Sequence, residues 1–390
     1  MRNLSADLDA LKQQHRYRSR RVVDSIDGVE ITIDGNSVTN FSSNDYLGLS
    51  QHPDVIAAMQ RGVKQYGAGS GAAHLITGHS RAHHQLEEEL AELTGYPRAL
   101  LFSTGYMANL GTISALVGRG DAVFEDRLNH ASLIDGGLIS GARLQRYPHS
   151  DIHSLCNKLE ASKSAEKLIV TDGVFSMDGD IAPLPDLVKA TTRHDARLMV
   201  DDAHGFGVLG KEGAGSVAHF MLQEEVPIYM ATLGKAAGVS GAFVAGSEAL
   251  IETLIQRARS YIYTTALPPA VAEALRASLK IIRSDSERRE RLHAHIKHFR
   301  SGASGLGLQL MNSPTAIQPI IIGDDATAMK MSHRLFEAGF AVSAIRPPTV
   351  PEGSARLRIT LSASHTTEQI DRLLEALQKC SPTPMEGTDA

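Results

Sequence analysis

The chain has 390 residues, 42% hydrophobic and 21% charged, which is typical of a globular protein with a large core and more than one domain. Its 39 basic and 44 acidic residues give a net charge of −5, which favours neither nucleic acid nor an acidic membrane as a partner. Two cysteines, Cys156 and Cys380, exclude a disulfide framework and favour a reducing compartment. No apolar run approaches the roughly 20 residues of a membrane span, and no secretory leader pattern is present, so we expect a soluble, cytoplasmic protein.

The N-terminal residues combine a helical pattern with a basic run. Leu4, Leu8 and Leu11 fall on one face of a helix. Acidic residues are absent from positions 10–23, and the basic residues there are Lys12, Arg16, Arg18, Arg20 and Arg21. This run is either a solvated helix end or a basic arm that meets an anionic substrate, and the residues leave both interpretations open.

An alternation of helices and short apolar strands follows. A hairpin is expected at 31–41, turning at 34–36. From about residue 53 the patterns predict helices at 55–63, 86–93 and 107–117, and buried strands at 99–102, 168–171, 198–201, 228–232 and 242–245. Strands that alternate with helices predict an α/β layer with a mostly parallel sheet.

The pattern changes after about residue 270 and predicts a second, smaller α+β domain. We expect helices at 275–282, 284–299, 326–338 and 370–377, and strands at 317–322, 340–345 and 356–361. Thr366 and Gln369 are spaced as a capping box before the last helix. The tail after Cys380 is rich in Pro, Thr and Gly and is expected to be disordered. We expect an N-terminal helix and short strands at 1–45 and a large α/β domain at 46–275. The small α+β domain should span 276–380, and the tail 381–390.

The first chemical candidate is Lys235, which follows an apolar strand and lies among small residues. A lysine desolvated in this way has a lowered pKa, and its neutral amine can attack an aldehyde. Small neighbours leave room for a bulky cofactor. By itself, the motif fits a surface lysine in a glycine-rich turn better.

A second candidate is Asp201, which ends an apolar strand at the edge where open α/β sheets bind ligands. His204 follows about one turn later. A buried carboxylate here can keep a pyridine nitrogen protonated, which makes the ring an electron sink. The alternative is a helix cap beside a satisfied histidine. A metal site is less favoured, because a third ligand at suitable spacing is missing.

Two further segments could hold parts of an anionic, flat ligand. The turn before Gly105 and Tyr106 lies at a predicted helix N-terminus, where free N–H groups favour a phosphate. His130, in the segment 129–132, could stack on a flat ring, although most lone histidines do not. Neither signal is specific alone.

A predicted strand at 356–361 places Arg356 and Arg358 on one face by its alternation. An arginine on a strand can grip a carboxylate with two hydrogen bonds. A solvent-facing arginine pair is the equally supported alternative.

Two other interpretations are rejected. The glycine-rich segment 67–72 suggests a dinucleotide-binding fingerprint, but a helix precedes it where that fingerprint needs a strand. His79, His83 and His84 lack the glutamate of a zinc-protease helix, so we expect no metal there.

Taken together and in this order, the motifs supply each part that pyridoxal 5′-phosphate (PLP) needs. The chain resembles the α-oxoamine synthases, a PLP family of fold type I, from about Arg18 to Leu377. The most specific stretches are Asn40–Ser50, Gly173–Asp180, Val200–Gly205 and Ala344–Pro351. The resemblance implies a large domain with a mostly parallel seven-stranded sheet, a smaller C-terminal α+β domain, and a homodimer with shared active sites.

The resemblance also implies roles for individual residues. Lys235, His130, Asp201 and His204 would be catalytic. Lys235 would carry PLP as a Schiff base, Asp201 would pair with the pyridine nitrogen, and His130 would stack on the ring. The implied cofactor-binding residues are completed by Gly105, Tyr106, Ser176, His204 and Thr232, with Thr264 or Thr265 reaching the phosphate from the other subunit. The implied substrate-binding residues are Arg18, Asn44, His130, Arg346, Thr349 and Arg358.

The substrates that the resemblance implies are L-alanine and a pimeloyl thioester of coenzyme A or a carrier protein. Other members of the family use glycine or serine with other acyl-CoAs, as in 2-amino-3-ketobutyrate ligase. A non-catalytic subunit of the same fold and a nicotinamide dehydrogenase are weaker alternatives. Ala236 and Ala237 depart from the glycine and aromatic residue of many relatives, which leaves the local packing open.

Overall fold

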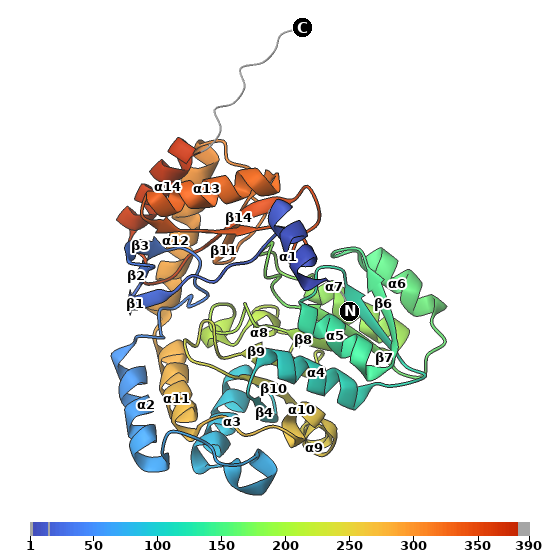
Figure 1. The fold of residues 1–390 in the computed structure, drawn as a ribbon. Coiled ribbons are helices and arrows are strands. Elements are labelled where there is room, and N and C mark those ends of the chain that lie inside the picture. The colour runs from blue at the N-terminus through green and yellow to red at the C-terminus, as the bar shows by residue number, and fades with distance from the viewer. Residues whose placement is uncertain (1–2, 15, 381–390) are drawn as a thin grey trace. The chain divides into compact units, whose positions relative to one another are not determined.

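The computed structural model describes residues 3–14 and 16–380, so the predicted tail at 381–390 lies outside the described residues. The chain forms two compact units. We call residues 44–176 and 180–289 the large unit. The small unit consists of the residues up to Ser43, the segment Met177–Gly179 and the residues from Glu290 onward. Figure 1 shows the helices and strands of both.

The large unit is built on a seven-stranded sheet in the order β4-β10-β9-β8-β7-β5-β6. Only β10 runs antiparallel to its neighbours β4 and β9, so the prediction of a mostly parallel sheet is confirmed. The strands are β4 (Arg98–Phe102), β5 (Ala122–Asp126), β6 (Arg143–Tyr147), β7 (Lys167–Asp172), β8 (Arg197–Asp201), β9 (Ile228–Thr232) and β10 (Ala242–Gly246).

Two of these strands, β5 and β6, were not predicted from the sequence. β6 forms one edge of the sheet and has exposed arginines at both Arg143 and Arg146, so it lacks an apolar run. β5 is fully buried but contains Glu125 and Asp126, which interrupt its apolar pattern. Because β5 contains buried carboxylates and β6 is a polar edge strand, neither shows the apolar run by which the other strands were predicted.

Helices pack along this sheet and against one another (Figure 1). The segment before the glycine-rich loop is α2, as predicted. α2 packs on α11 at Gly62, where a Cβ would lie 2.7 Å from the Cα of Ala270. The helices of the large unit are α2 (Pro53–Tyr66), η1 (His74–Gly78), α3 (Arg81–Thr94), α4 (Gly105–Leu116), α5 (Ala131–Ser140), α6 (Ile152–Ala161), α7 (Leu184–His194), η2 (Lys211–Gly213), α8 (Ser216–His219), α9 (Glu248–Arg257), α10 (Arg259–Ile262) and α11 (Pro269–Ser284).

The small unit holds two further sheets, in the orders β1-β2-β3-β12 and β11-β14-β13. The predicted strand at 340–345 is divided between them, because β12 pairs with β3 while β13 pairs with β14. The strands are β1 (Val23–Asp27), β2 (Glu30–Ile33), β3 (Asn36–Asn40), β11 (Ile317–Gly323), β12 (Phe340–Ala341), β13 (Ser343–Ile345) and β14 (Ala355–Thr360).

Local signals in the small unit produce the predicted turns and caps. The β2–β3 hairpin turns at Asp34 and Gly35, which have φ of 49° and 77°, the left-handed values that a two-residue hairpin requires. Thr366 N donates to Gln369 Oε1 (2.8 Å) and Gln369 N donates to Thr366 Oγ1 (3.2 Å), which confirms the capping box. The helices are α1 (Leu4–Gln13), α13 (Asp325–Glu337) and α14 (Thr367–Cys380), and α12 (Ser286–Gly305) enters the unit from residue 290.

Among the described residues, none of the helices combines the length and apolar character needed to cross a membrane. Both cysteines, Cys156 and Cys380, are free.

Candidate active site

A cavity of about 310 Å³ lies at the carboxyl ends of three adjacent parallel strands of the large unit. Asp172, Asp201 and Thr232 end β7, β8 and β9, and all three line the cavity. Loops that leave this edge of an open α/β sheet form its usual ligand crevice. The residues expected from the sequence that line the cavity are Asn44, Gly105, Tyr106, His130, Ser176, Asp201, His204, Thr232 and Lys235.

Lys235 lies in the loop that joins β9 to β10. Backbone hydrogen bonds close this loop, from Leu233 N to Gly241 O (2.8 Å) and from Gly238 N to Lys235 O (2.8 Å). The lysine side chain is half-buried at the cavity. The loop therefore presents a single amine to the cavity from a constrained backbone.

The two alanines after the lysine are closely packed. Ala236 and Ala237 are both buried, and Ser278 Oγ donates to Ala237 O (2.7 Å). A Cβ on Gly207 would lie 2.7 Å from the Cβ of Ala236. Small residues thus meet on both sides of this contact, so Ala236 packs against Gly207 without space for a larger side chain at position 207.

Asp201 is buried and held by two donors. Ala203 N donates to its Oδ1 (3.0 Å), and Asn109 Nδ2 donates to its Oδ2 (2.6 Å). Asn109 Nδ2 also donates to Ser132 Oγ (2.8 Å), which lies 2.7 Å from His130 Nδ1. The carboxylate and the imidazole are therefore connected by one hydrogen-bond network.

The network defines the protonation of His130. Ser132 Oγ accepts from Asn109 and so can donate its own proton to His130 Nδ1, and Ser132 N also donates to that atom (3.3 Å). With Nδ1 accepting, the ring proton is on Nε2. Burial lowers the pKa of His130; Asp201 raises it and Lys235 lowers it. The imidazole is therefore neutral at neutral pH.

Asp172 is a second buried carboxyl, on the strand next to Asp201. Burial and then the nearby Asp201 carboxylate raise its pKa well above the usual value, while a hydrogen bond from His130 N (2.9 Å) and the Lys235 amine oppose the rise. Two such carboxyls cannot both ionise easily in a buried site. Asp172 is the one that tends to keep its proton.

His204 is oriented by a tyrosine that the sequence analysis did not single out. Tyr46 Oη lies 2.5 Å from His204 Nδ1 and donates to Asn44 Oδ1 (3.2 Å). Either Tyr46 Oη or His204 Nδ1 can be the donor in this contact, according to the tautomer of the imidazole. This chain of contacts orients both Asn44 and His204 at the cavity.

Ser176 reaches the cavity from the loop after β7. Phe175 N donates to Asp180 O (3.0 Å), which closes the loop. His149 lies between two carboxylates, Asp126 Oδ1 (3.1 Å) and Asp180 Oδ2 (3.0 Å). Burial lowers the pKa of His149, but the hydrogen bonds and charges of both carboxylates outweigh burial and raise the pKa to about 10. A charged imidazolium thus ties the loop to the end of β5.

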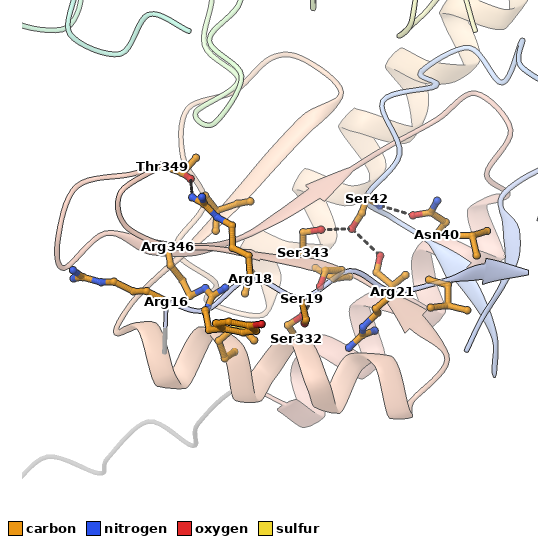
Figure 2. A pocket seen from close by; sticks show the side chains of 18 of the residues that line it. Arg16, Arg18, Ser19, Arg21, Asn40, Ser42, Ser332, Ser343, Arg346 and Thr349 are labelled. Atoms are coloured by element: carbon orange, nitrogen blue, oxygen red, sulfur yellow. Dashed lines mark hydrogen bonds between the residues drawn. The ribbon is translucent and has the colours of Figure 1, made fainter. Parts of the chain in front are cut away.

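Arg18, Arg346 and Thr349 line a different cavity, of about 580 Å³, in the small unit. Figure 2 shows Arg18 directed toward Thr349, and Arg18 Nη2 donates to Thr349 Oγ1 (3.3 Å). Arg16 lines the same cavity and pairs with Glu352 (3.0 Å). The basic run is therefore divided, because Arg16, Arg18 and Arg21 line this cavity, whereas Lys12 and Arg20 are exposed and do not line it.

Arg358 lies in β14 and is buried, as is Arg356. Arg358 Nη1 donates to Thr360 Oγ1 (3.0 Å), and Arg356 forms an ion pair with Asp178. The alternative of a solvent-facing arginine pair is therefore wrong. A buried guanidinium requires anionic or polar partners, and Arg356 has one in Asp178.

Thr264 and Thr265 lie outside the cofactor cavity, in the segment after α10. Thr265 pairs with Ala73 in an isolated antiparallel bridge, and Ser103 Oγ donates to Thr265 O (3.3 Å). The Thr265 side chain is exposed. A contribution of these threonines to a second subunit stays a prediction.

The chain is similar in sequence to known proteins over almost its whole length. The model of the family "Aminotransferase class I and II" matches residues 36–377. An 8-amino-7-oxononanoate synthase from Methylococcus capsulatus is 62% identical over 376 residues, which is 96% of this chain and 97% of that protein. The chain belongs to the aminotransferase class I and II family, among its 8-amino-7-oxononanoate synthases.

Solved structures agree with this family assignment. A serine palmitoyltransferase from S. paucimobilis with a bound PLP–myriocin aldimine matches with a TM-score of 0.92 and 32% identity, over 97% of this chain and 96% of that one. The 8-amino-7-oxononanoate synthase from Francisella tularensis matches with a TM-score of 0.76 and 36% identity, over 88% and 97%. Fold type I and PLP as the family's cofactor, both implied by the resemblance, are confirmed.

The cavity of this family member fits PLP. Thr232 Oγ1 is buried and has no hydrogen-bond partner among the described residues, so a donor or acceptor is available for a phosphate. Thr104 caps α4, and Gly105 opens it with free backbone N–H groups. A Cβ on Gly105 would lie 2.6 Å from Thr232 Cγ2, so a side chain there would fill the space beside that hydroxyl. Lys235 and Asp201 supply the amine and the carboxylate that the cofactor's aldehyde and ring nitrogen require.

Asn109, Ser132, Asp172 and Tyr46 were not singled out in the sequence analysis. Each lies close to a motif that was recognised, because Asn109 is one turn into the helix that begins at Gly105 and Ser132 follows His130 by two residues. A buried asparagine inside an otherwise apolar helix was the available signal for Asn109. Its partner Asp201 is 92 residues away, and only the fold brings the two together.

Proposed function

We propose that the chain catalyses the decarboxylative condensation of L-alanine with a pimeloyl thioester. The products are 8-amino-7-oxononanoate, CO2 and the free thiol, as a step of biotin biosynthesis. The observation that carries the proposal is identity of about 60% with 8-amino-7-oxononanoate synthases over almost the whole chain, together with the PLP-sized cavity.

The roles of individual residues are part of the proposal. Lys235 holds the cofactor through its amine, Asp201 pairs with the ring nitrogen, and neutral His130 lies against the ring. Thr232 and the N-terminus of α4 hold the phosphate. When bound, PLP supplies an electron sink for the negative charge that develops on the substrate Cα.

The chain's own groups would move the protons and orient the substrates. Lys235 Nζ would take the proton from the substrate Cα and later return one. Asn44 and Arg358 hold the amino-acid carboxylate. His204 and Ser176, which both line the cavity, would lie near the ring's phenolic oxygen.

The acyl substrate is proposed to contact Arg18, Arg346 and Thr349. Four guanidinium groups line one cavity there, those of Arg16, Arg18, Arg21 and Arg346. Burial lowers the pKa of Arg346, Asp325 opposes that change, and the neighbouring Arg18 lowers the pKa further. Like charges kept close together favour an anion between them. The free carboxylate of a pimeloyl chain has the matching charge.

A homodimer with shared active sites, possible docking of an acyl carrier protein and a cytoplasmic location complete the proposal. The dimer would bring Thr264 or Thr265 to the phosphate of the other subunit. The serine palmitoyltransferase match concerns the fold of the whole chain, so it does not separate alanine from serine as the substrate.

Substrate choice can be tested with the purified holoenzyme. L-Alanine, glycine and L-serine would each be offered with pimeloyl-CoA and with the pimeloyl carrier protein, and the amino-ketone product identified by mass spectrometry. We expect 8-amino-7-oxononanoate from L-alanine, and a change of the cofactor's absorbance on adding L-alanine alone. A product formed from glycine or serine in preference to alanine would move the chain to another branch of the α-oxoamine synthases.

A further inference from the structure

A histidine-rich group in the large unit lies apart from the residues assigned to the reaction. His79 precedes α3, and His84 and Glu87 lie one turn apart on that helix. They line a separate cavity of about 280 Å³. One ligand atom from each of the three lies within 4.8 Å of the other two. We propose that His79, His84 and Glu87 bind a divalent transition-metal ion such as Zn²⁺.

His79 is oriented as a metal-binding histidine is. Its Nδ1 lies 3.1 Å from His74 Nδ1, a distance at which one proton is shared between the two nitrogens. The His74 ring is itself stacked on Tyr261 (5.2 Å, 11°) and is buried. When the shared proton is carried by His79 Nδ1, His79 presents the Nε2 lone pair to the cavity. A hydrogen bond to the second ring nitrogen commonly orients metal-ligating histidines in this way.

Glu87 is oriented by the same principle. Its Oε1 accepts from Leu101 N (2.9 Å), and its Oε2 lies 3.9 Å from His79 Nε2. Two ligand atoms on a tetrahedral zinc ion lie roughly 3.4 Å apart, given bond lengths of about 2.0–2.2 Å. The pair therefore needs to close by only about half an ångström.

The third ligand is free to adjust. The His84 side chain is 52% exposed, and its Nε2 lies 3.4 Å from Glu88 Oε1 at the surface. Rotation about its side-chain bonds would bring this nitrogen to the ion. Two histidines and one carboxylate form a set that suits zinc and leaves a coordination position for water.

The surroundings distinguish this set from other combinations of the same histidines. His83 uses both ring nitrogens, one near Ser80 N (3.0 Å) and one at Leu267 O (2.6 Å), so it is not a ligand. Arg98 also lines the cavity, but its guanidinium is paired with Glu248 and Glu252.

No metal was expected here from the sequence, because these histidines were compared only with the histidines of zinc-protease helices. The relevant carboxylate is Glu87, eight residues after His79, and not a glutamate between two histidines. His79 lies outside α3, so helical spacing does not describe its position. His79 lies between η1 and α3, and its Nε2 is 3.9 Å from Glu87 Oε2 on that helix.

The test is zinc titration of tag-free, metal-stripped holoenzyme in competition with a chromophoric chelator, with the melting temperature measured in parallel. We expect one zinc ion per chain and a rise in melting temperature. His84→Ala and Glu87→Gln should each weaken zinc binding about tenfold or more, on the scale typical of lost metal-site contacts. The glutamine keeps an acceptor for Leu101 N, so it removes the ligand and preserves that hydrogen bond.

The matched control is His333→Ala. His333 and Glu337 form an exposed i, i+4 pair on α13 (3.5 Å), the same spacing as His84 and Glu88, and they belong to no three-ligand group within the described part of the chain. Zinc binding should be unchanged in this variant, and His84→Cys, which restores a zinc ligand, should bind more tightly than His84→Ala. Absence of stoichiometric binding, or wild-type affinity in both His84→Ala and Glu87→Gln, would overturn the proposal. The readout is independent of turnover, so failure of the proposed function would leave it unaffected.

Discussion

At the scale of single residues, the cofactor cavity depends on groups whose protons are set by their neighbours. His130 is neutral because it is buried and its Nδ1 accepts from Ser132. Asp172 tends to stay protonated because burial raises its pKa, and Asp201 on the adjacent strand raises it further. Lys235 is the one amine among the residues that line this cavity. The chemistry proposed for the site therefore depends most on that side chain.

Replacing Lys235 by alanine should remove both cofactor attachment and proton transfer. We expect the visible absorbance of the holoenzyme to disappear and kcat to fall by at least about 10²–10⁴-fold, the contribution of one positioned proton-transfer group. The measurements are an absorbance spectrum and steady-state turnover. Lys211→Ala, at an exposed lysine of the same unit, is the control. A Lys235→Ala enzyme that kept its absorbance and its turnover would refute the assignment.

Glu125 offers a test of stability against pH. The residue is fully buried in β5, and neither carboxylate oxygen has a hydrogen-bond partner among the described residues. Burial raises the pKa of Glu125 to about 7, with the charge of Arg146 lowering it and that of Asp135 raising it. The folded state thus holds this proton more tightly than the unfolded state, where the pKa is about 4.5. Stability contributed by the neutral form is therefore lost as pH rises from about 4.5 through about 7.

Glu125→Gln should remove this pH dependence, because the amide stays neutral. Relative to wild type, the variant should gain roughly 2–3 kcal/mol in free energy of unfolding between pH 5 and pH 8. Denaturant unfolding at both pH values measures the difference. The exposed Glu224→Gln should show no comparable change, and an equal effect of Glu125→Gln at both pH values would contradict the assigned protonation.

At the scale of elements, the site is made where strands end and helices begin. The last residues of β7, β8 and β9 line the cavity, and so do the first residues of α4. The approach of α4 to β9 is close, because Gly105 and Thr232 leave no space for an added methyl group between them. The first turn of α4 can therefore serve as a phosphate site only while glycine occupies that position.

Gly105→Ala should weaken PLP binding more than it disturbs the fold. Overpacking costs about 1–3 kcal/mol, which corresponds to roughly tenfold or more in the cofactor's dissociation constant. Fluorescence titration of the apoenzyme with PLP measures the change. Gly118→Ala is the matched control, since a Cβ there would have only Ser140 O nearby, at 3.9 Å. Equal PLP affinity in the two variants would show that the Gly105 contact is unimportant for the cofactor.

At the scale of the whole molecule, the proposed homodimer makes a prediction that neither unit makes alone. If Thr264 or Thr265 serves the phosphate site of the other subunit, each active site depends on two chains. Mixing Lys235→Ala with a Thr264→Val/Thr265→Val double variant should then restore activity. Random exchange of subunits yields heterodimers in half of the molecules, each with one intact site of two, so about one quarter of wild-type activity is expected.

This complementation is measured after subunits are unfolded and refolded together, with each variant refolded alone as the control. If the activity of the mixture equals the sum of the activities of the two separate variants, the threonines act in the active site of their own subunit. That outcome would leave the family assignment intact and would remove the shared site from the proposal.

The sequence by itself determined the fold class and most of the residues at the cofactor cavity. Apolar strands at 168–171, 198–201 and 228–232 each end in a polar residue, and parallel strands place those ends at one edge. Local rules also determined the capping box at Thr366 and the turn at Asp34, because hydrogen bonds between residues close in the chain need no tertiary context.

Only the tertiary structure decided which distant residues meet. Asn109 reaches Asp201 across 92 residues, and Tyr46 reaches His204 across 158. It also decided the burial of Arg356 and Arg358, because alternation along a strand separates two faces without showing which face is covered by another element. Periodicity reports local geometry, whereas burial, hydrogen-bond partners and protonation depend on what the rest of the chain packs against each side chain.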